Sequence, residues 1–343
     1  MSALAVQTDV DSVSDRLGRP LRDLRISVTD RCNFRCPYCM PRSHYGAGHQ
    51  FLNRREQLDV DEIERVAGVF VSLGVTKIRL TGGEPLLRAD LAEIVARLAA
   101  LGVPDLALTT NGSLLRRWAA RLERAGLRRV TVSLDSLDPA VFAAMSDTQV
   151  DVSQVLDGIA AAREAGLEPI KLNCVVRRGV NDATLLPLVE YARRERLVLR
   201  FIEYMDVGTS NGWTSAEVVP GDEILERVSQ HYALVEQTEE PPGVARVYRF
   251  ADGGGELGMI MSVSRPFCGD CTRARLGVDG RLYTCLFATA GLDLRGPLRD
   301  GADDEALREL VLSRWRHRSD RYSEIRSSMT TSLRRIEMSY IGG

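Results

Sequence analysis

Long apolar runs, a secretory leader and aromatic side chains are scarce or absent in this chain of 343 residues. No apolar run approaches the ~20 residues that cross a bilayer. The first residues include acidic side chains where a signal peptide has a basic start and an apolar stretch. Aromatic residues make up 6% of the chain and the formal net charge is −2, so we expect neither a nucleic acid nor a membrane as a partner. These absences predict a cytoplasmic protein.

Lysine is rare, and cysteine is present in an odd number. Lys77 and Lys171 are the only lysines, so 43 of the 45 basic residues are arginines. Seven cysteines without an export signal argue against a disulfide framework and favour metal-binding or catalytic thiols. Six of them form two groups of three, and the seventh stands alone: Cys32, Cys36 and Cys39; Cys268, Cys271 and Cys285; and Cys174.

Strand-like and helix-like segments alternate along the first two thirds of the chain. The strand-like pieces are short and bounded by Gly, Asn or Asp, and the helix-like pieces have apolar residues three and four apart. Six strands separated by five helices require parallel βαβ units, which form a barrel or a doubly wound sheet. The expected strands are 24–29, 77–80, 106–109, 130–134, 170–176 and 197–202, and the expected helices are 59–73, 91–101, 115–125, 152–165 and 183–194.

We predict an α/β protein built on an incomplete (βα)6 TIM-like barrel. Residues 1–19 are expected to form a mobile leader and residues 20–205 the partial barrel. Beyond Met205 the alternation of strand-like and helix-like segments stops, and Gly and Pro become frequent. Residues 206–343 are therefore interpreted as an extension packed on the barrel. Ligands of such folds bind at the carboxyl ends of the strands, and the first cysteine group follows the first strand.

The first cysteine group offers three thiolates within one loop, one short of a closed four-cysteine metal site. A zinc site with a fourth ligand of another type, or a loop of free thiols, is possible on spacing alone. TDRCNFRCPYCMP (29–41) and TGGEP (81–85) resemble the radical S-adenosylmethionine superfamily. The resemblance implies a [4Fe–4S] cluster on Cys32, Cys36 and Cys39 with one open iron for S-adenosylmethionine, and contacts to that cofactor from Tyr38, Gly83, Ser133 and Met205.

The second cysteine group also provides three thiolates, and none of the four histidines lies near it in the sequence. The alternation of the following strand points Arg273 and Arg275 to the same side. Two guanidinium groups on one face suit phosphate oxygens, because each donates two parallel hydrogen bonds. A zinc knuckle with a solvated arginine face is the alternative interpretation.

The chain after the leader, from LGRPLRDLRISVTD to the final SYIGG, is similar to the GTP 3′,8-cyclase (MoaA) family of molybdenum cofactor biosynthesis. The resemblance implies a second [4Fe–4S] cluster on Cys268, Cys271 and Cys285 that binds the guanine base of GTP. It also implies that the terminal Gly342 and Gly343 enter the active site and, with Arg273 and Arg275, support catalysis. The GTP contacts implied by matching positions are Arg25, Arg79, Thr109, Lys171, Arg273 and Arg275.

The resemblance implies conversion of GTP to 3′,8-cyclo-7,8-dihydro-GTP by a 5′-deoxyadenosyl radical. Expected partners are a second copy of the chain in a homodimer, an electron donor of the flavodoxin or ferredoxin type, and the next pathway enzyme, cyclic pyranopterin monophosphate synthase. Two alternatives remain at this point. One is a radical enzyme that modifies peptides and carries an auxiliary cluster, and the other is a zinc-binding or RNA-binding module without catalysis.

Overall fold

The core of the molecule is one curved sheet whose central strands are all parallel. The computed structural model describes residues 13–238, 243–326 and 333–342. Six strands follow one another in sequence and in space: β1 (Asp23–Ser27), β2 (Lys77–Thr81), β3 (Asp105–Thr110), β4 (Arg129–Ser133), β5 (Lys171–Val176) and β6 (Val198–Glu203). The crossovers carry α1 (Val60–Ser72), α2 (Leu91–Ala100), α3 (Leu115–Arg124), α4 (Pro139–Ser146), α5 (Val152–Glu164) and α6 (Leu185–Arg194).

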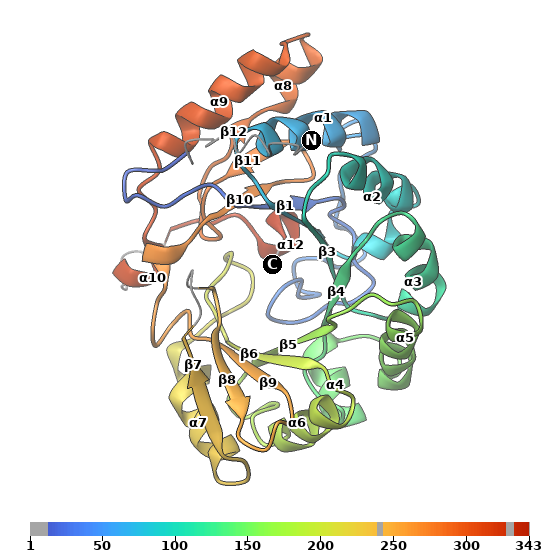
Figure 1. The fold of residues 1–343 in the computed structure, drawn as a ribbon, viewed down its shortest axis with the longest axis vertical. Coiled ribbons are helices and arrows are strands. Elements are labelled where there is room, and N and C mark those ends of the chain that lie inside the picture. Colours follow the sequence, from blue (N-terminus) through green and yellow to red (C-terminus); the bar gives the residue numbers. More distant parts are fainter. Residues whose placement is uncertain (1–12, 239–242, 327–332, 343) are drawn as a thin grey trace, which may run out of the picture.

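The predicted partial barrel is confirmed, and each predicted strand and helix lies within about two residues of an observed one. Apolar faces of the helices pack on the outside of the sheet, and the strands surround a central space (Figure 1). The sequence analysis missed helix α4. Its start carries a recognisable signal, since the Asp138 side chain accepts hydrogen bonds from the backbone of Ala140 and Val141, with Pro139 at the first helical position.

The extension joins both edges of the sheet and does not only pack on the barrel, which corrects the expectation for residues 206–343. Strand β10 pairs in parallel with β1, and β9 pairs in parallel with β6. The described residues therefore form a twelve-stranded sheet in the order β12-β11-β10-β1-β2-β3-β4-β5-β6-β9-β8-β7. Its added strands are β7 (Leu234–Gln237), β8 (Arg246–Phe250), β9 (Glu256–Ile260), β10 (Arg273–Leu276), β11 (Arg281–Tyr283) and β12 (Leu292–Asp293).

Helices of the extension pack on the barrel, and one of them turns inward. The helices are α7 (Gly221–Ser229), α8 (Arg295–Arg299), α9 (Asp304–Arg316), α10 (Tyr322–Ile325) and α12 (Met338–Ile341), and short 3-10 turns lie at Pro85–Leu87, Ser215–Glu217 and Cys268–Asp270. Helix α9 contacts α1, and α7 contacts β6. Figure 1 shows α12 and the carboxyl end of the chain in the middle of the ring of strands. In the part of the chain that the structure describes, no helix is both long and apolar enough to cross a membrane.

The leader is shorter than predicted. Residues 1–12 lie outside the described residues, but residues 13–19 pack against the extension, and Asp15 and Arg19 are buried. The two side chains form an ion pair of 2.7 Å, which the polar appearance of the segment did not reveal. The prediction of a mobile leader is therefore wrong for residues 13–19.

Glu203, at the carboxyl end of β6, attaches the extension to the barrel. Its side chain is buried and accepts hydrogen bonds from the backbone N–H groups of Gly221 at 2.8 Å, Val263 at 2.7 Å and Ser264 at 2.9 Å. One carboxylate thus holds the start of α7 and the segment after β9. A buried acceptor with several backbone donors stabilises both, because each donor is otherwise left without a partner.

We expect Glu203→Gln to lower the free energy of unfolding by about 2–3 kcal/mol, because an amide NH₂ replaces an acceptor that faces N–H donors. Urea unfolding followed by circular dichroism measures this change. Glu236→Gln is the matched control, since Glu236 is exposed and has a single 3.3 Å contact with Arg246, and it should change stability by less than about 0.5 kcal/mol. Equal effects of the two substitutions would contradict the role given to Glu203.

Candidate functional site

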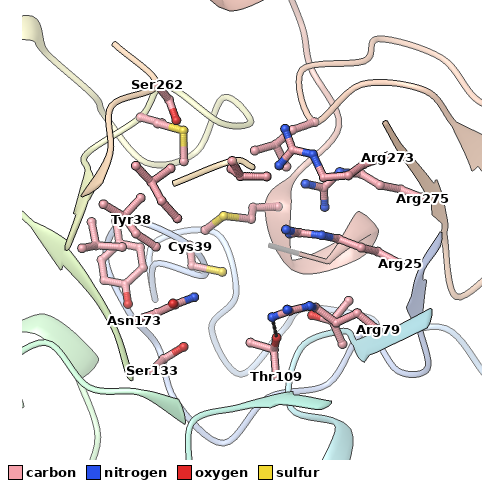
Figure 2. A pocket seen from close by; sticks show the side chains of 18 of the residues that line it. Arg25, Tyr38, Cys39, Arg79, Thr109, Ser133, Asn173, Ser262, Arg273 and Arg275 are labelled. Carbon is pink, nitrogen blue, oxygen red and sulfur yellow. Dashed lines mark hydrogen bonds between the residues drawn. The ribbon is translucent and has the colours of Figure 1, made fainter. Parts of the chain in front are cut away.

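Both cysteine groups line one cavity inside the curved sheet. The cavity reaches the carboxyl ends of the barrel strands and is closed on one side by the extension (Figure 2). The predicted residues that it brings together are Cys32, Cys36, Cys39, Cys268, Cys271, Cys285, Tyr38, Gly83, Ser133, Met205, Arg25, Arg79, Thr109, Arg273 and Arg275. Residues more than 200 positions apart in the sequence thus share one site.

The first cysteine group sits in the loop after β1, where its three residues are half-buried. Burial raises the pKa of Cys32 to about 12 and raises that of Cys36 well above its usual range. The Cys32 sulfur accepts a hydrogen bond from the backbone N–H of Phe34 at 3.4 Å. Three half-buried thiols in one loop form a donor set for a soft metal centre, whose positive charge would favour the thiolate forms.

The TGGEP turn after β2 packs directly against this loop. The backbone N–H of Gly83 donates to the Thr29 carbonyl and that of Glu84 to the Arg31 carbonyl, both at 2.7 Å. A Cβ atom at Gly83 would lie 2.2 Å from the Arg31 carbonyl oxygen, so only glycine fits. Glu84 is buried, with its pKa raised to about 7 by burial, and it accepts from Thr110 Oγ1 at 2.7 Å. The turn therefore fixes the position of the cysteine loop.

Tyr38 is held by a carboxylate from the opposite side of the barrel. Its hydroxyl donates to Asp135 Oδ2 at 2.8 Å, and Asp135 Oδ1 accepts from the Val175 backbone N–H at 2.8 Å. Burial raises the pKa of Asp135 to about 7. Ser133, at the end of β4, and Met205, after β6, line the same part of the cavity. The four residues predicted to contact S-adenosylmethionine thus border one space.

The second cysteine group lies in the extension, next to the amino-terminal segment, whose Arg19 donates to the Cys268 carbonyl at 2.7 Å. Burial opposes ionisation of Cys271, but the guanidinium groups of Arg273 and Arg318 outweigh it and lower the pKa of this thiol to about 6. Arg273 Nη2 lies 3.3 Å from the Cys271 sulfur. Burial raises the pKa of Cys285 to about 11. Cys271 is therefore prepared to act as a thiolate ligand at neutral pH.

In neither cysteine group are the three sulfur atoms arranged around a single metal ion. Among the described residues, no three His, Cys, Asp or Glu side chains are close enough together to hold a single metal ion. An iron–sulfur cluster makes a different demand, because each thiolate binds an iron of its own.

Four arginines project into the cavity from neighbouring strands (Figure 2). In the register of the sheet, Arg25 on β1 pairs with Arg79 on β2 and with Arg275 on β10. Within the described residues, Arg25, Arg79, Arg273 and Arg275 form no ion pair with a carboxylate within 4 Å. Burial, aided by neighbouring arginines, lowers the pKa of Arg79 to about 10 and that of Arg275 well below its usual range. These four arginines form a basic wall of the cavity, called the arginine wall below, which suits an anion of high charge.

Lys171 lies in a hollow next to the cavity, at the amino ends of the strands, and not in the cavity itself. The two spaces share Arg25, Arg79 and Arg273 in their walls. Burial and the nearby Arg200 lower the pKa of Lys171 to about 7. The other lysine, Lys77, lines the same hollow. Both lysines of the chain therefore extend the basic wall beyond the cavity.

The carboxyl-terminal tail reaches this basic wall. Arg275 donates a hydrogen bond to the carbonyl of Gly342, which has a φ of +72°. A Cβ atom at Gly342 would lie 2.1 Å from Thr81 Cγ2, and Thr81 lines the cavity. The Glu337 carboxylate anchors the tail by accepting from Thr209 N at 2.9 Å and Ser210 Oγ at 2.7 Å. Gly343 lies outside the described residues.

The sequence analysis missed several polar residues of the site. Arg19 and Arg318 line the cavity beside the second cysteine group, and Arg129 and Arg200 line the hollow around Lys171. No motif marks these arginines, which come from segments far apart in the sequence. The rarity of lysine was the one signal that pointed to Lys77.

Comparison with known proteins accounts for most of the chain. Residues 26–192 match the family model of the radical SAM superfamily, and residues 197–324 match the model named Molybdenum Cofactor Synthesis C. SuiB from Streptococcus suis bound to S-adenosylmethionine has a TM-score of 0.60 at 16% identity, covering 90% of this chain and 68% of that one. SuiB bound to the precursor peptide SuiA has a TM-score of 0.61 at 15% identity, covering 93% and 68%. At these identities the likeness concerns the fold alone.

Full-length sequence relatives are far more similar. A protein named GTP 3′,8-cyclase from Acidothermus cellulolyticus is 53% identical, covering 96% of this chain and 99% of that protein. Proteins of the same name are 53% identical in Xanthomonas axonopodis pv. citri, over 96% and 99%, and 46% identical in Staphylococcus aureus, over 97% and 100%. The resemblance inferred from the cysteine motifs is confirmed. The chain belongs to the radical S-adenosylmethionine superfamily and, within it, to the GTP 3′,8-cyclase family.

Proposed function

We propose that this chain converts GTP to 3′,8-cyclo-7,8-dihydro-GTP, the first step of molybdenum cofactor biosynthesis. Relatives with this printed name, 45–53% identical over nearly the whole chain, support the reaction. The observation that carries the proposal here is a single cavity lined by two cysteine triads and four arginines without a carboxylate partner in the described residues. The peptide-modifying alternative has no comparable support, because the likeness to SuiB concerns the fold alone.

Membership of the superfamily brings S-adenosylmethionine and a [4Fe–4S] cluster, and the residues of the first triad fit such a cluster. Cys32, Cys36 and Cys39 are three half-buried donors that leave a fourth iron open. When bound, the cluster supplies the electron that splits S-adenosylmethionine and yields the 5′-deoxyadenosyl radical. Tyr38 and Met205, which line the same part of the cavity, would orient the cofactor. The cavity would limit the access of water to the radical.

The second triad fits a second [4Fe–4S] cluster, which we propose binds the guanine base of GTP. Cys268, Cys271 and Cys285 line the cavity, and the lowered pKa of Cys271 favours its thiolate form. The buried Arg273 Nε has no hydrogen-bond partner among the described residues, which fits a missing acceptor at this position. The role assigned to this chain's residues is to hold the base so that the ribose faces the first triad.

The arginine wall would hold the triphosphate. Arg25, Arg79 and Arg275 lie on three adjacent strands, so their guanidinium groups present a row of donors. Thr109 accepts a hydrogen bond from Arg79 Nη1 at 3.0 Å and orients it. Lys171 would reach the phosphate chain from the adjoining hollow. We further propose a homodimer, an electron donor of the flavodoxin or ferredoxin type and transfer of the product to cyclic pyranopterin monophosphate synthase.

Protein purified without oxygen tests the proposal directly. We expect roughly eight irons per chain, as two four-iron clusters require, and 5′-deoxyadenosine formation that increases when GTP is added after reduction with dithionite. Roughly four irons per chain, with S-adenosylmethionine cleavage that does not increase when GTP is added, would refute the second cluster and GTP as the substrate. Zinc in place of iron, with no cleavage, would refute the whole assignment.

Substitution of the second triad should separate its role from that of the first. We expect Cys268→Ser to reduce iron to roughly four atoms per chain and to abolish the cyclised product, while cleavage of S-adenosylmethionine without GTP continues. Cys174→Ser is the control, because Cys174 is buried in the core and belongs to neither triad. Iron analysis and chromatography of both products measure the effects, and full product formation by the Cys268 variant would contradict the assignment.

The lowered pKa of Lys171 predicts a pH dependence of GTP binding. Its pKa is about 7 in the free chain, and a bound triphosphate should raise it by stabilising the ammonium form. Binding then takes up a proton above pH 7, and affinity should fall by up to about tenfold per pH unit from pH 7.5 to 9. Titration calorimetry in buffers of different ionisation enthalpy measures both. Lys171→Arg keeps its charge and should lose the proton uptake; an unchanged pH slope would refute this role.

The tail prediction uses glycines in different surroundings. Gly342→Ala should displace the tail, because the new methyl group overlaps Thr81 Cγ2, and reduce product formation on the order of a hundredfold at unchanged iron content. Gly301→Ala is the control, since Gly301 has a φ of +87° but nothing within 4 Å of a Cβ atom. Adding Thr81→Ser removes Cγ2 and should recover part of the activity. Full activity of Gly342→Ala would show that the tail is not needed.

A further inference from the structure

Three buried charged side chains from opposite ends of the chain meet beside the second cysteine triad. The side chains of Asp15, Arg19 and Arg318 are exposed by only 0%, 2% and 1%. Asp15 Oδ2 accepts from Arg19 Nε at 2.7 Å and from Arg318 Nη1 at 3.2 Å. The Arg318 guanidinium also lies 4.5 Å from the centre of the Trp315 ring. We name these three residues the ion triad.

The ion triad binds the loop that carries Cys268 and Cys271. Arg19 Nη1 donates to the backbone carbonyl of Cys268 at 2.7 Å, and Arg318 Nη1 donates to that of Cys271 at 2.7 Å. Both arginines therefore bind the loop through its backbone and leave the sulfur atoms free. Because their side chains are themselves fixed by Asp15, the loop is held from behind by groups with little freedom to move.

The ion triad is incompletely satisfied on the side of the cavity. Arg19 Nη2 and Arg318 Nε are buried and have no hydrogen-bond partner among the described residues, and both residues line the cavity. A second carboxylate, that of Asp320, lies 3.6 Å from Arg318 Nε, so two carboxylates face the two guanidinium groups. The guanidinium groups, and not the Asp15 carboxylate, donate hydrogen bonds to the cysteine loop.

We propose that Asp15, Arg19 and Arg318 are positioning residues that hold the second iron–sulfur cluster, and that the two guanidinium groups bound to the cysteine loop raise its reduction potential. The inference rests on the proposed second cluster. Reduction adds one negative charge to a cluster, and nearby buried cations stabilise that charge, so the potential rises with the positive charge around it. The segment before β1 thus belongs to the site, although it carries none of the metal ligands.

The test isolates the second cluster in the full chain by combining Cys32→Ala, Cys36→Ala and Cys39→Ala. In this parent protein, iron analysis and a redox titration followed by electron paramagnetic resonance measure how much cluster is bound and its midpoint potential. We expect Arg318→Gln to lower the potential, because a positive charge is lost, and Asp15→Asn to raise it, because a negative charge is lost. Arg316→Gln is the matched control, since Arg316 is the exposed last residue of α9, two positions before Arg318, and it should shift neither.

Opposite shifts distinguish a charge effect from mere loosening of the loop, which would move both variants in the same direction. Shifts of the same sign, or no shift while the cluster stays bound, would overturn the inference. Arg318→Lys keeps the positive charge and should retain most of the parent's midpoint potential, which provides a test even if Arg318→Gln does not fold. Arg19→Gln removes a positive charge and gives the size of the drop expected on neutralisation. A drop in potential as large as this in Arg318→Lys would also overturn the inference. A parent protein without iron would instead refute the second cluster, and hence the proposed function of that triad.

Discussion

Repulsion between like charges is the constraint on which the rest of the site depends. Arg25, Arg79 and Arg275 are neighbours in the register of a parallel sheet, and burial lowers the pKa of each. Backbone pairing fixes the distance between their Cα atoms, so all three side chains remain in the wall of one cavity. The protein stores an unfavourable interaction that an anion relieves. The same repulsion makes a polyphosphate a better occupant than a neutral molecule.

The pairing of β10 with β1 brings the two cysteine triads together. The first triad follows β1, and the second lies on both sides of β10 and β11. The space between them is therefore bordered by one cysteine triad at each end, and the arginines lie on β10, β1 and β2. The added strands extend the sheet at both of its edges. A domain resting on the barrel surface would not give this arrangement, because its cysteines would lie outside the sheet.

Periodicity in the sequence was enough to predict the six strands and five of the six crossover helices, because each of those signals is local. The partners of the edge strands were not predictable, since nothing in 273–276 marks β1 as its neighbour. The cysteines, Tyr38 and Gly83 were found through motifs with fixed spacing. Arg19 and Arg318 were not, because their role depends on a contact between residues about 300 positions apart. The segment around Asp15 was predicted to be mobile for the same reason, because Arg318, which holds it, lies far away in the sequence.

The scarcity of lysine makes the hollow next to the cavity chemically addressable. Lys77 and Lys171 are the only lysine amines of the chain, and both line that hollow. With a pKa of about 7, much of Lys171 is the uncharged amine at neutral pH, which is the form that attacks acylating reagents. An amine-selective reagent should therefore label this wall of the nucleotide site in the unaltered protein. Protection from that label gives a footprint of whatever occupies the hollow, with no substitution and no added reporter group.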